Sequence, residues 1–114
     1  NGLSENKLIT TDDDGILKKN ALHEIKSAYT STTLNTTLSD NYEIYIHEGG
    51  DVTYTLPAPS TRSGKSWKIV NIGIGTITTS IHFHEGSETR NTIINKAGAY
   101  SVTLFSDGTK YIAL

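Results

Sequence analysis

The chain has 114 residues, which is enough for one domain with one hydrophobic core. Its 12 acidic and 10 basic residues give a net charge of −2 and form no basic stripe, so we exclude a nucleic-acid-binding protein. The absence of Cys excludes disulfides and zinc–thiolate sites, and no apolar run is long enough for membrane insertion. Since the chain starts Asn-Gly and contains no Met, we expect a fragment of a longer protein.

Residues 1–28 are predicted to form an N-terminal connecting segment. Lys7–Thr11 has the composition of a short strand, and the acidic residues and Gly of Asp12–Gly15 predict a turn. Apolar residues at helical spacing predict a short helix from about Leu17 to Ala28. A helix of this length is marginal alone, so we expect it to need a packing partner.

From Tyr29 to Leu114 the sequence predicts only strands, as expected for a Thr-rich chain with ten Gly. Turn signals recur about every eight to twelve residues, which is typical of a sandwich or small barrel. We therefore predict an all-β fold for residues 29–114, an antiparallel β-sandwich of the jelly-roll type. The expected strands cover residues 29–38, 42–47, 52–56, 67–72, 76–80, 81–84, 91–95, 99–105 and 110–114.

The end of the chain carries the clearest local signal, a strand–turn–strand from Tyr100 to Leu114. Asp107-Gly108 has the chemistry of a hairpin turn, and apolar pairs on both sides predict cross-strand contacts. Earlier in the chain, Trp67 alternates with Ile69, which favours a core position for the indole over an exposed sugar-stacking position.

Two short stretches, His47–Gly50 and His84–Ser87, share the order His-Glu-Gly and follow alternating apolar strands. Neither contains the second His of a His-Glu-x-x-His zinc motif. We interpret both as similar hairpin ends.

Several motifs occur in a fixed order over residues 52–114: Thr55–Pro59, Trp67–Gly73, Gly75–Thr78 and Tyr100–Tyr111. In this order they resemble a β-domain that recurs in bacteriophage tail fibres, tail spikes and related receptor-binding proteins. The resemblance implies a viral protein of the virion, extracellular and non-enzymatic, that assembles as a homotrimer and attaches to a glycan or protein of the bacterial surface. In such a trimer, three short helices can bury their apolar faces on a common axis.

Two other functions remain open. The chain could be a purely structural trimerisation or collar module of a fibre, or a carbohydrate-binding module attached to a depolymerase. Glycan binding by the isolated chain would favour attachment or the carbohydrate-binding module. A trimer without host binding would favour the structural module.

Recognition residues usually lie in loops on a rigid scaffold. We therefore choose Arg62 and Lys65, in the polar loop Pro59–Ser66, and Arg90 with Asn91 as candidate ligand-binding residues.

For metal binding, His82 and His84 would point to the same side of a strand. Two imidazoles without further ligands are a weak metal site, so we favour two solvent-facing side chains. The chain has no Gly-x-Ser-x-Gly motif, and Gly73-Ile74-Gly75 lacks the third Gly of a dinucleotide site. We expect neither catalytic residues nor a cofactor.

Overall fold

The computed structural model describes residues 26–96 and 100–114, and these residues are almost entirely strand. Most of the expected helix over Leu17–Ala28 lies outside the described residues, and Lys26–Ala28 have no regular secondary structure. The described elements are β1 (Tyr29–Thr32), β2 (Thr36–Thr37), β3 (Ile44–His47), β4 (Val52–Thr55), the 3-10 turn η1 (Pro59–Thr61), β5 (Ser66–Asn71), β6 (Thr76–Glu85), β7 (Glu88–Ile94), β8 (Tyr100–Ser106) and β9 (Tyr111–Ala113).

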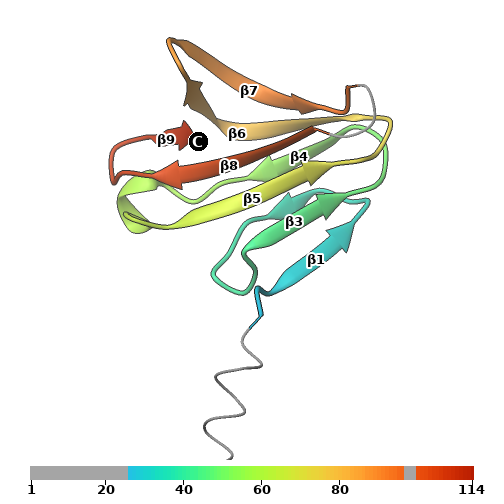
Figure 1. Cartoon of the computed structure of the whole chain (residues 1–114), viewed down its shortest axis with the longest axis horizontal. Coiled ribbons are helices and arrows are strands. Elements are labelled where there is room, and N and C mark those ends of the chain that lie inside the picture. Colours follow the sequence, from blue (N-terminus) through green and yellow to red (C-terminus); the bar gives the residue numbers. More distant parts are fainter. Residues whose placement is uncertain (1–25, 97–99) are drawn as a thin grey trace, which may run out of the picture.

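One continuous sheet folds back on itself into a sandwich-like arrangement (Figure 1). Its strand order is β1-β3-β5-β8-β9-β6-β4-β2, and β7 pairs with β6 outside this path. β9 joins the two halves of the sheet, whereas β1 and β2 leave it open at the opposite end. The prediction of an all-β, sandwich-like fold is confirmed.

The expected antiparallel pairing is found only in the C-terminal part. The pairs β1–β3, β3–β5, β2–β4, β4–β6 and β6–β9 are parallel, whereas β5–β8, β8–β9 and β6–β7 are antiparallel. The chain coils instead of following a jelly-roll path. We use the word rung for two strands that follow each other in the chain without being hydrogen-bonded to each other; the three rungs are β1 with β2, β3 with β4, and β5 with β6. The connections between the two strands of a rung (residues 33–35, 48–51 and 72–75) are called the arcs.

The stacked rungs bury one side of each strand. Tyr45 of β3 lies opposite Ile69 of β5, which lies opposite Val102 of β8, and all three side chains are buried. Trp67 is fully buried, as predicted, and its Nε1 donates a 2.8 Å hydrogen bond to the Ser39 carbonyl. Burial of each large side chain contributes about 1.5–3 kcal/mol, so the buried residues Tyr45, Trp67, Ile69 and Val102 are a major source of stability.

Each arc is held by the polar residue that precedes it. Thr32 Oγ1 accepts from the Leu34 amide at 3.0 Å, and His47 Nε2 donates to the Gly50 carbonyl at 2.6 Å. Asn71 accepts from the Gly73 amide and donates to the Gly75 carbonyl. These side chains satisfy backbone groups that the bend would otherwise leave unpaired.

Side chains also connect one rung to the next. Asn35 Oδ1 accepts the Thr53 amide at 2.9 Å, and Asp51 Oδ1 accepts the Thr76 amide at 2.8 Å. In both cases an Asn or Asp just before the second strand of a rung pairs with the following rung. The two His-Glu-Gly stretches, His47–Gly50 and His84–Ser87, therefore differ in structure. The first leads into the arc between β3 and β4, so its interpretation as a hairpin end is wrong. The second is a hairpin end, between β6 and β7.

The strand expected to break between Ser80 and Ile81 is continuous. β6 runs from Thr76 to Glu85, with a register shift against β7 between Thr78 and Phe83. The Ser80 hydroxyl accepts the Leu56 amide at 2.9 Å within this irregular stretch. The shift absorbs the bend where β6 changes partner from β4 to β9.

Candidate binding surfaces

The loop between β4 and β5 is fixed by the C-terminal hairpin. Tyr111 donates its hydroxyl to the Pro57 carbonyl at 2.7 Å, and Ser106 donates its hydroxyl to the Pro59 carbonyl at 2.8 Å. Backbone bonds join Gly64 to Ser106 and Ser106 to Lys65. Figure 1 shows the β8–β9 turn beside this loop. Because both ends of the loop are held, its side chains are presented on a rigid backbone.

The hairpin itself matches its prediction. Leu104, Phe105 and Ser106 pair with Ala113, Ile112 and Tyr111. Gly108 has a φ of 93°, a conformation that favours Gly. This geometry lets the Asp107 side chain accept the amides of Thr109 and Lys110.

Arg62 and Lys65 lie together in this loop, as predicted, and both already make contacts within the chain. Arg62 Nε bonds Asp40 Oδ1 at 3.1 Å, and its Nη1 donates to the Thr61 carbonyl at 3.0 Å. Lys65 Nζ lies 5.7 Å from the centroid of the Trp67 ring. We call Asp40, Thr61, Arg62, Ser63 and Lys65 the loop surface.

The electrostatic setting of the loop surface depends on neighbouring buried and charged groups. Burial raises the pKa of Tyr111, and the positive charge of Arg62 opposes that rise. On the adjoining β8–β9 turn, hydrogen bonds from Lys110 and Thr109 lower the pKa of Asp107 to about 2. The Asp107 carboxylate on this turn is therefore ionised at neutral pH.

Arg90 and Asn91 do not lie in a loop, because both belong to strand β7. Arg90 Nη1 bonds Glu85 Oε1 at 2.6 Å, and the Arg90 guanidinium lies 6.0 Å from the Tyr100 ring centroid. The Tyr100 hydroxyl donates to Glu85 Oε2 at 3.1 Å. No sequence pattern predicts this cluster, because Glu85, Arg90 and Tyr100 lie on three different strands.

The predicted ligand-binding residues form two separate groups, Arg62 with Lys65 and Arg90 with Asn91. Within residues 26–96 and 100–114, no hydrogen bond or ion pair links Arg62 or Lys65 to Arg90 or Asn91. They are separate surfaces, and the rigid loop belongs only to the first.

His82 and His84 lie on β6 on either side of the buried Phe83. His82 is exposed and His84 is half-buried. No group of three or more His, Cys, Asp or Glu side chains with metal-site geometry occurs in the described part of the chain. Metal binding by this pair stays an untested hypothesis.

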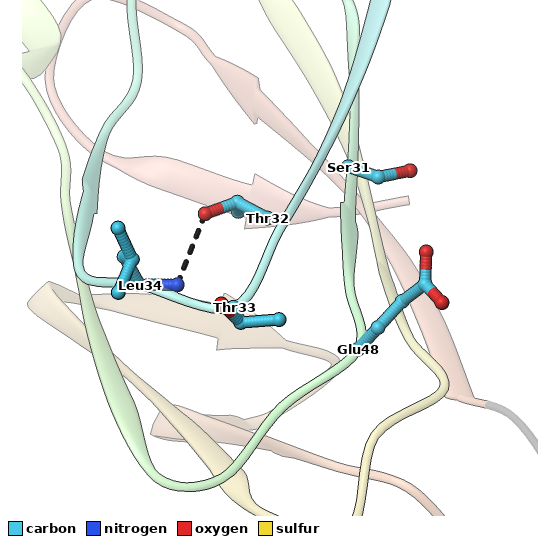
Figure 2. Close-up of a pocket in the computed structure, with 5 residues that line it drawn as sticks. All are labelled: Ser31, Thr32, Thr33, Leu34 and Glu48. Carbon is cyan, nitrogen blue, oxygen red and sulfur yellow. Dashed lines mark hydrogen bonds between the residues drawn. The ribbon is translucent and has the colours of Figure 1, made fainter.

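A shallow cavity of about 480 Å³ lies where the first rung meets the second. Its lining consists of Ser31, Thr32, Thr33, Leu34 and Glu48 (Figure 2). The bond from the Leu34 amide to Thr32 Oγ1 fixes the tight first arc, and Figure 2 shows the Glu48 side chain extending away from this bond. Sequence reasoning missed this cavity, because its residues become neighbours only when the rungs stack.

Within residues 26–96 and 100–114, no helix is long and apolar enough to span a membrane. Comparisons with protein-family models, curated proteins and solved structures find no match to this chain. The resemblance to phage fibre domains therefore rests on the sequence motifs.

Proposed function

We propose that this chain is a non-enzymatic domain of a bacteriophage tail fibre or tail spike that mediates attachment to the bacterial surface. The loop surface is the recognition site, and its ligand is a surface polysaccharide or an exposed part of a surface protein. The observation that carries the proposal is the rigid loop: hydrogen bonds from Tyr111, Ser106 and Gly64 hold its backbone before any ligand arrives. A preordered site loses less conformational entropy on binding.

The chemistry of the loop surface suits a ligand rich in hydroxyl or carboxylate groups. The Arg62 guanidinium has five N–H donors, and its hydrogen bonds to other described residues use Nε and Nη1. The exposed Ser63 hydroxyl adds a donor and an acceptor nearby. The Asp40 carboxylate and the Thr61 hydroxyl, which already donates to the Ala58 carbonyl, add acceptors. Such a mixed polar surface on a fixed backbone can select one pattern of sugar hydroxyls.

The proposal is tested by measuring binding of the labelled chain to a panel of bacterial strains, by flow cytometry. We expect Arg62→Ala to weaken binding to a recognised strain by about tenfold or more, because an Arg anchor is lost. Lys68→Ala is the matched control: it also removes one positive charge, but from an exposed position on β5. Equal effects of both substitutions would contradict a specific role for the loop surface.

A structural module of the fibre is the second candidate, favoured by the stacked rungs and their Asn35 and Asp51 bonds. Solenoid-like stacks of this kind propagate as extended supports. Light scattering at micromolar concentration separates the two. A trimer that binds no strain in the panel supports the structural module, and a monomer contradicts the predicted homotrimer.

A further inference from the structure

The outward side of the parallel strands β1, β3 and β5 carries a group of neighbouring apolar side chains. Tyr29 of β1 lies opposite Ile44 of β3, and Ile46 of β3 lies opposite Val70 of β5. Ile72 follows β5 directly and stays bonded to β3, because its amide lies 2.9 Å from a β3 carbonyl. Figure 1 shows the three strands side by side. We call these five residues the apolar face.

Much of the apolar face is accessible to solvent in the single chain. Tyr29 is 64% exposed and Ile72 is 45% exposed, and the other three side chains are half-buried. Leaving apolar area in water costs about 25 cal/mol per Å² relative to burying it. A contiguous apolar surface of this kind is typical of a contact with another protein.

The other layer of the sheet shows that the fold does not require an apolar outer side. The outward residues of β4 and of the first part of β6 are threonines, namely Thr53, Thr55, Thr76 and Thr78. Threonine suits a strand and presents a hydroxyl to water. The two layers pack inward alike but differ in outward chemistry. The apolar face therefore reflects what covers that side of the molecule.

Strand β3 has the composition of a strand that is buried on both sides. Its residues Ile44, Tyr45 and Ile46 are apolar in succession, and β5 continues from the buried Ile69 to the outward Val70. Such runs are typical of parallel sheets that are covered on both faces. The inward side of β3 and β5 is covered by the second layer. The outward side is the one left for a partner.

The charges around the apolar face favour a second copy of this chain as that partner. Lys68 lies opposite Ile44 at one side of the face, and Glu48 follows the last residue of β3 at another. One positive and one negative charge cancel, so two copies meet without net repulsion. A second apolar face also covers the apolar centre of the first. We propose that the apolar face is the contact between copies of this chain.

Sedimentation equilibrium of the full 114-residue chain tests the proposal. We expect the chain to associate, and Ile46→Thr or Ile72→Thr to raise the concentration at which it associates by about tenfold, because an apolar contact is lost. Threonine is also β-branched, so both substitutions keep a side chain that suits a strand. Near-ultraviolet circular dichroism of the buried Trp67 checks that each variant is folded. Because Ile72 is exposed in the single chain, its substitution leaves the core unchanged.

Ile94→Thr is the matched control for Ile72→Thr. Ile94 lies on β7, outside the apolar face, and is 46% exposed, against 45% for Ile72. We expect Ile94→Thr to leave association unchanged. Lys68→Ala should also preserve it, because charges at the rim of an interface affect the association rate more than the affinity.

Two results would overturn the proposal. The first is a chain that stays monomeric at about 1 mM. The second is association in which Ile72→Thr behaves like the Ile94→Thr control, because the contact would then not involve the apolar face. The measurement contains no glycan, and the apolar face shares no residue with the loop surface. The result therefore stands or fails separately from the proposed attachment function.

Discussion

Asp107 fixes the last turn of the chain through bonds to its own neighbours. Its Oδ1 accepts the Thr109 amide at 2.8 Å and the Lys110 amide at 2.9 Å, and Lys110 Nζ lies 2.9 Å from Oδ2. Gly108 supplies the positive φ that places these amides. Asp-Gly carries this information locally, which is why the turn could be predicted from the sequence.

The turn should give a measurable pH dependence. The folded-state pKa of Asp107 is about 2, below its ordinary value of 3.8, so its stabilising effect is present above about pH 4 and is lost as the pH falls towards 2. We expect Asp107→Asn to lower the melting temperature at pH 6 and to have little effect near pH 2. Circular dichroism melts of both proteins across this range measure the difference. A difference that stays constant with pH would contradict the role of the ionised carboxylate.

The candidate site was predictable only in part. Arg62 and Lys65 were found because prolines and small polar residues mark their loop. Arg90 and Asn91 were chosen as loop residues at the start of the expected strand 91–95, whereas both lie inside β7, which begins at Glu88; their polar neighbourhood is also compatible with the exposed side of a strand. Residue type alone does not separate an exposed strand from a loop.

At the scale of elements, the arcs allow the rungs to stack closely. A Cβ on Gly75 would overlap the backbone of Gly50 and Asp51, and a Cβ on Gly73 would overlap that of Gly49. Each glycine is therefore required by the adjacent arc, not by its own φ angle. The sequence predicted turns here, but it could not show that the turns of different rungs touch.

Gly75→Ala and Gly50→Ala test the arc stack as a pair. We expect Gly75→Ala to lower the free energy of unfolding by roughly 2–4 kcal/mol, because the arcs must move apart. A Cβ on Gly50 meets no atom within 4 Å, so Gly50→Ala should change stability by no more than about 0.5 kcal/mol. Urea unfolding measures both values. A mild effect at Gly75 would show that the arcs are not in close contact.

Most strand positions were predictable, except that residues 29–38 form two strands, β1 and β2, and residues 76–85 form the single strand β6. Strand directions were not predictable. Alternating residues such as Tyr45 and Trp67 show which side of a strand is buried. The same alternation is compatible with parallel and antiparallel neighbours. The coiled path is therefore shown only by the structure, for example by the parallel register of β3 on β5. The all-β class followed from composition, whereas the topology depended on contacts between distant residues.

At the scale of the whole molecule, the two ends of the sheet differ. β8 and β9 close one end, and the same hairpin fixes the loop surface. At the other end, β1 and β2 are the edge strands of the sheet among the described residues. The proposed recognition surface therefore lies at the closed end of the sheet, away from the open edges of the first rung.

The most direct test of the attachment function is an NMR titration of the chain with surface polysaccharide from a bound strain. We predict chemical-shift changes confined to the loop surface, to the remaining residues of the loop 57–65 that carries it, and to the adjoining turn 107–110. We also predict that Arg62→Ala abolishes these changes while Lys68→Ala preserves them. Changes centred on β7 and the Glu85–Arg90–Tyr100 cluster, or no changes with any polysaccharide tested, would contradict recognition through the loop surface.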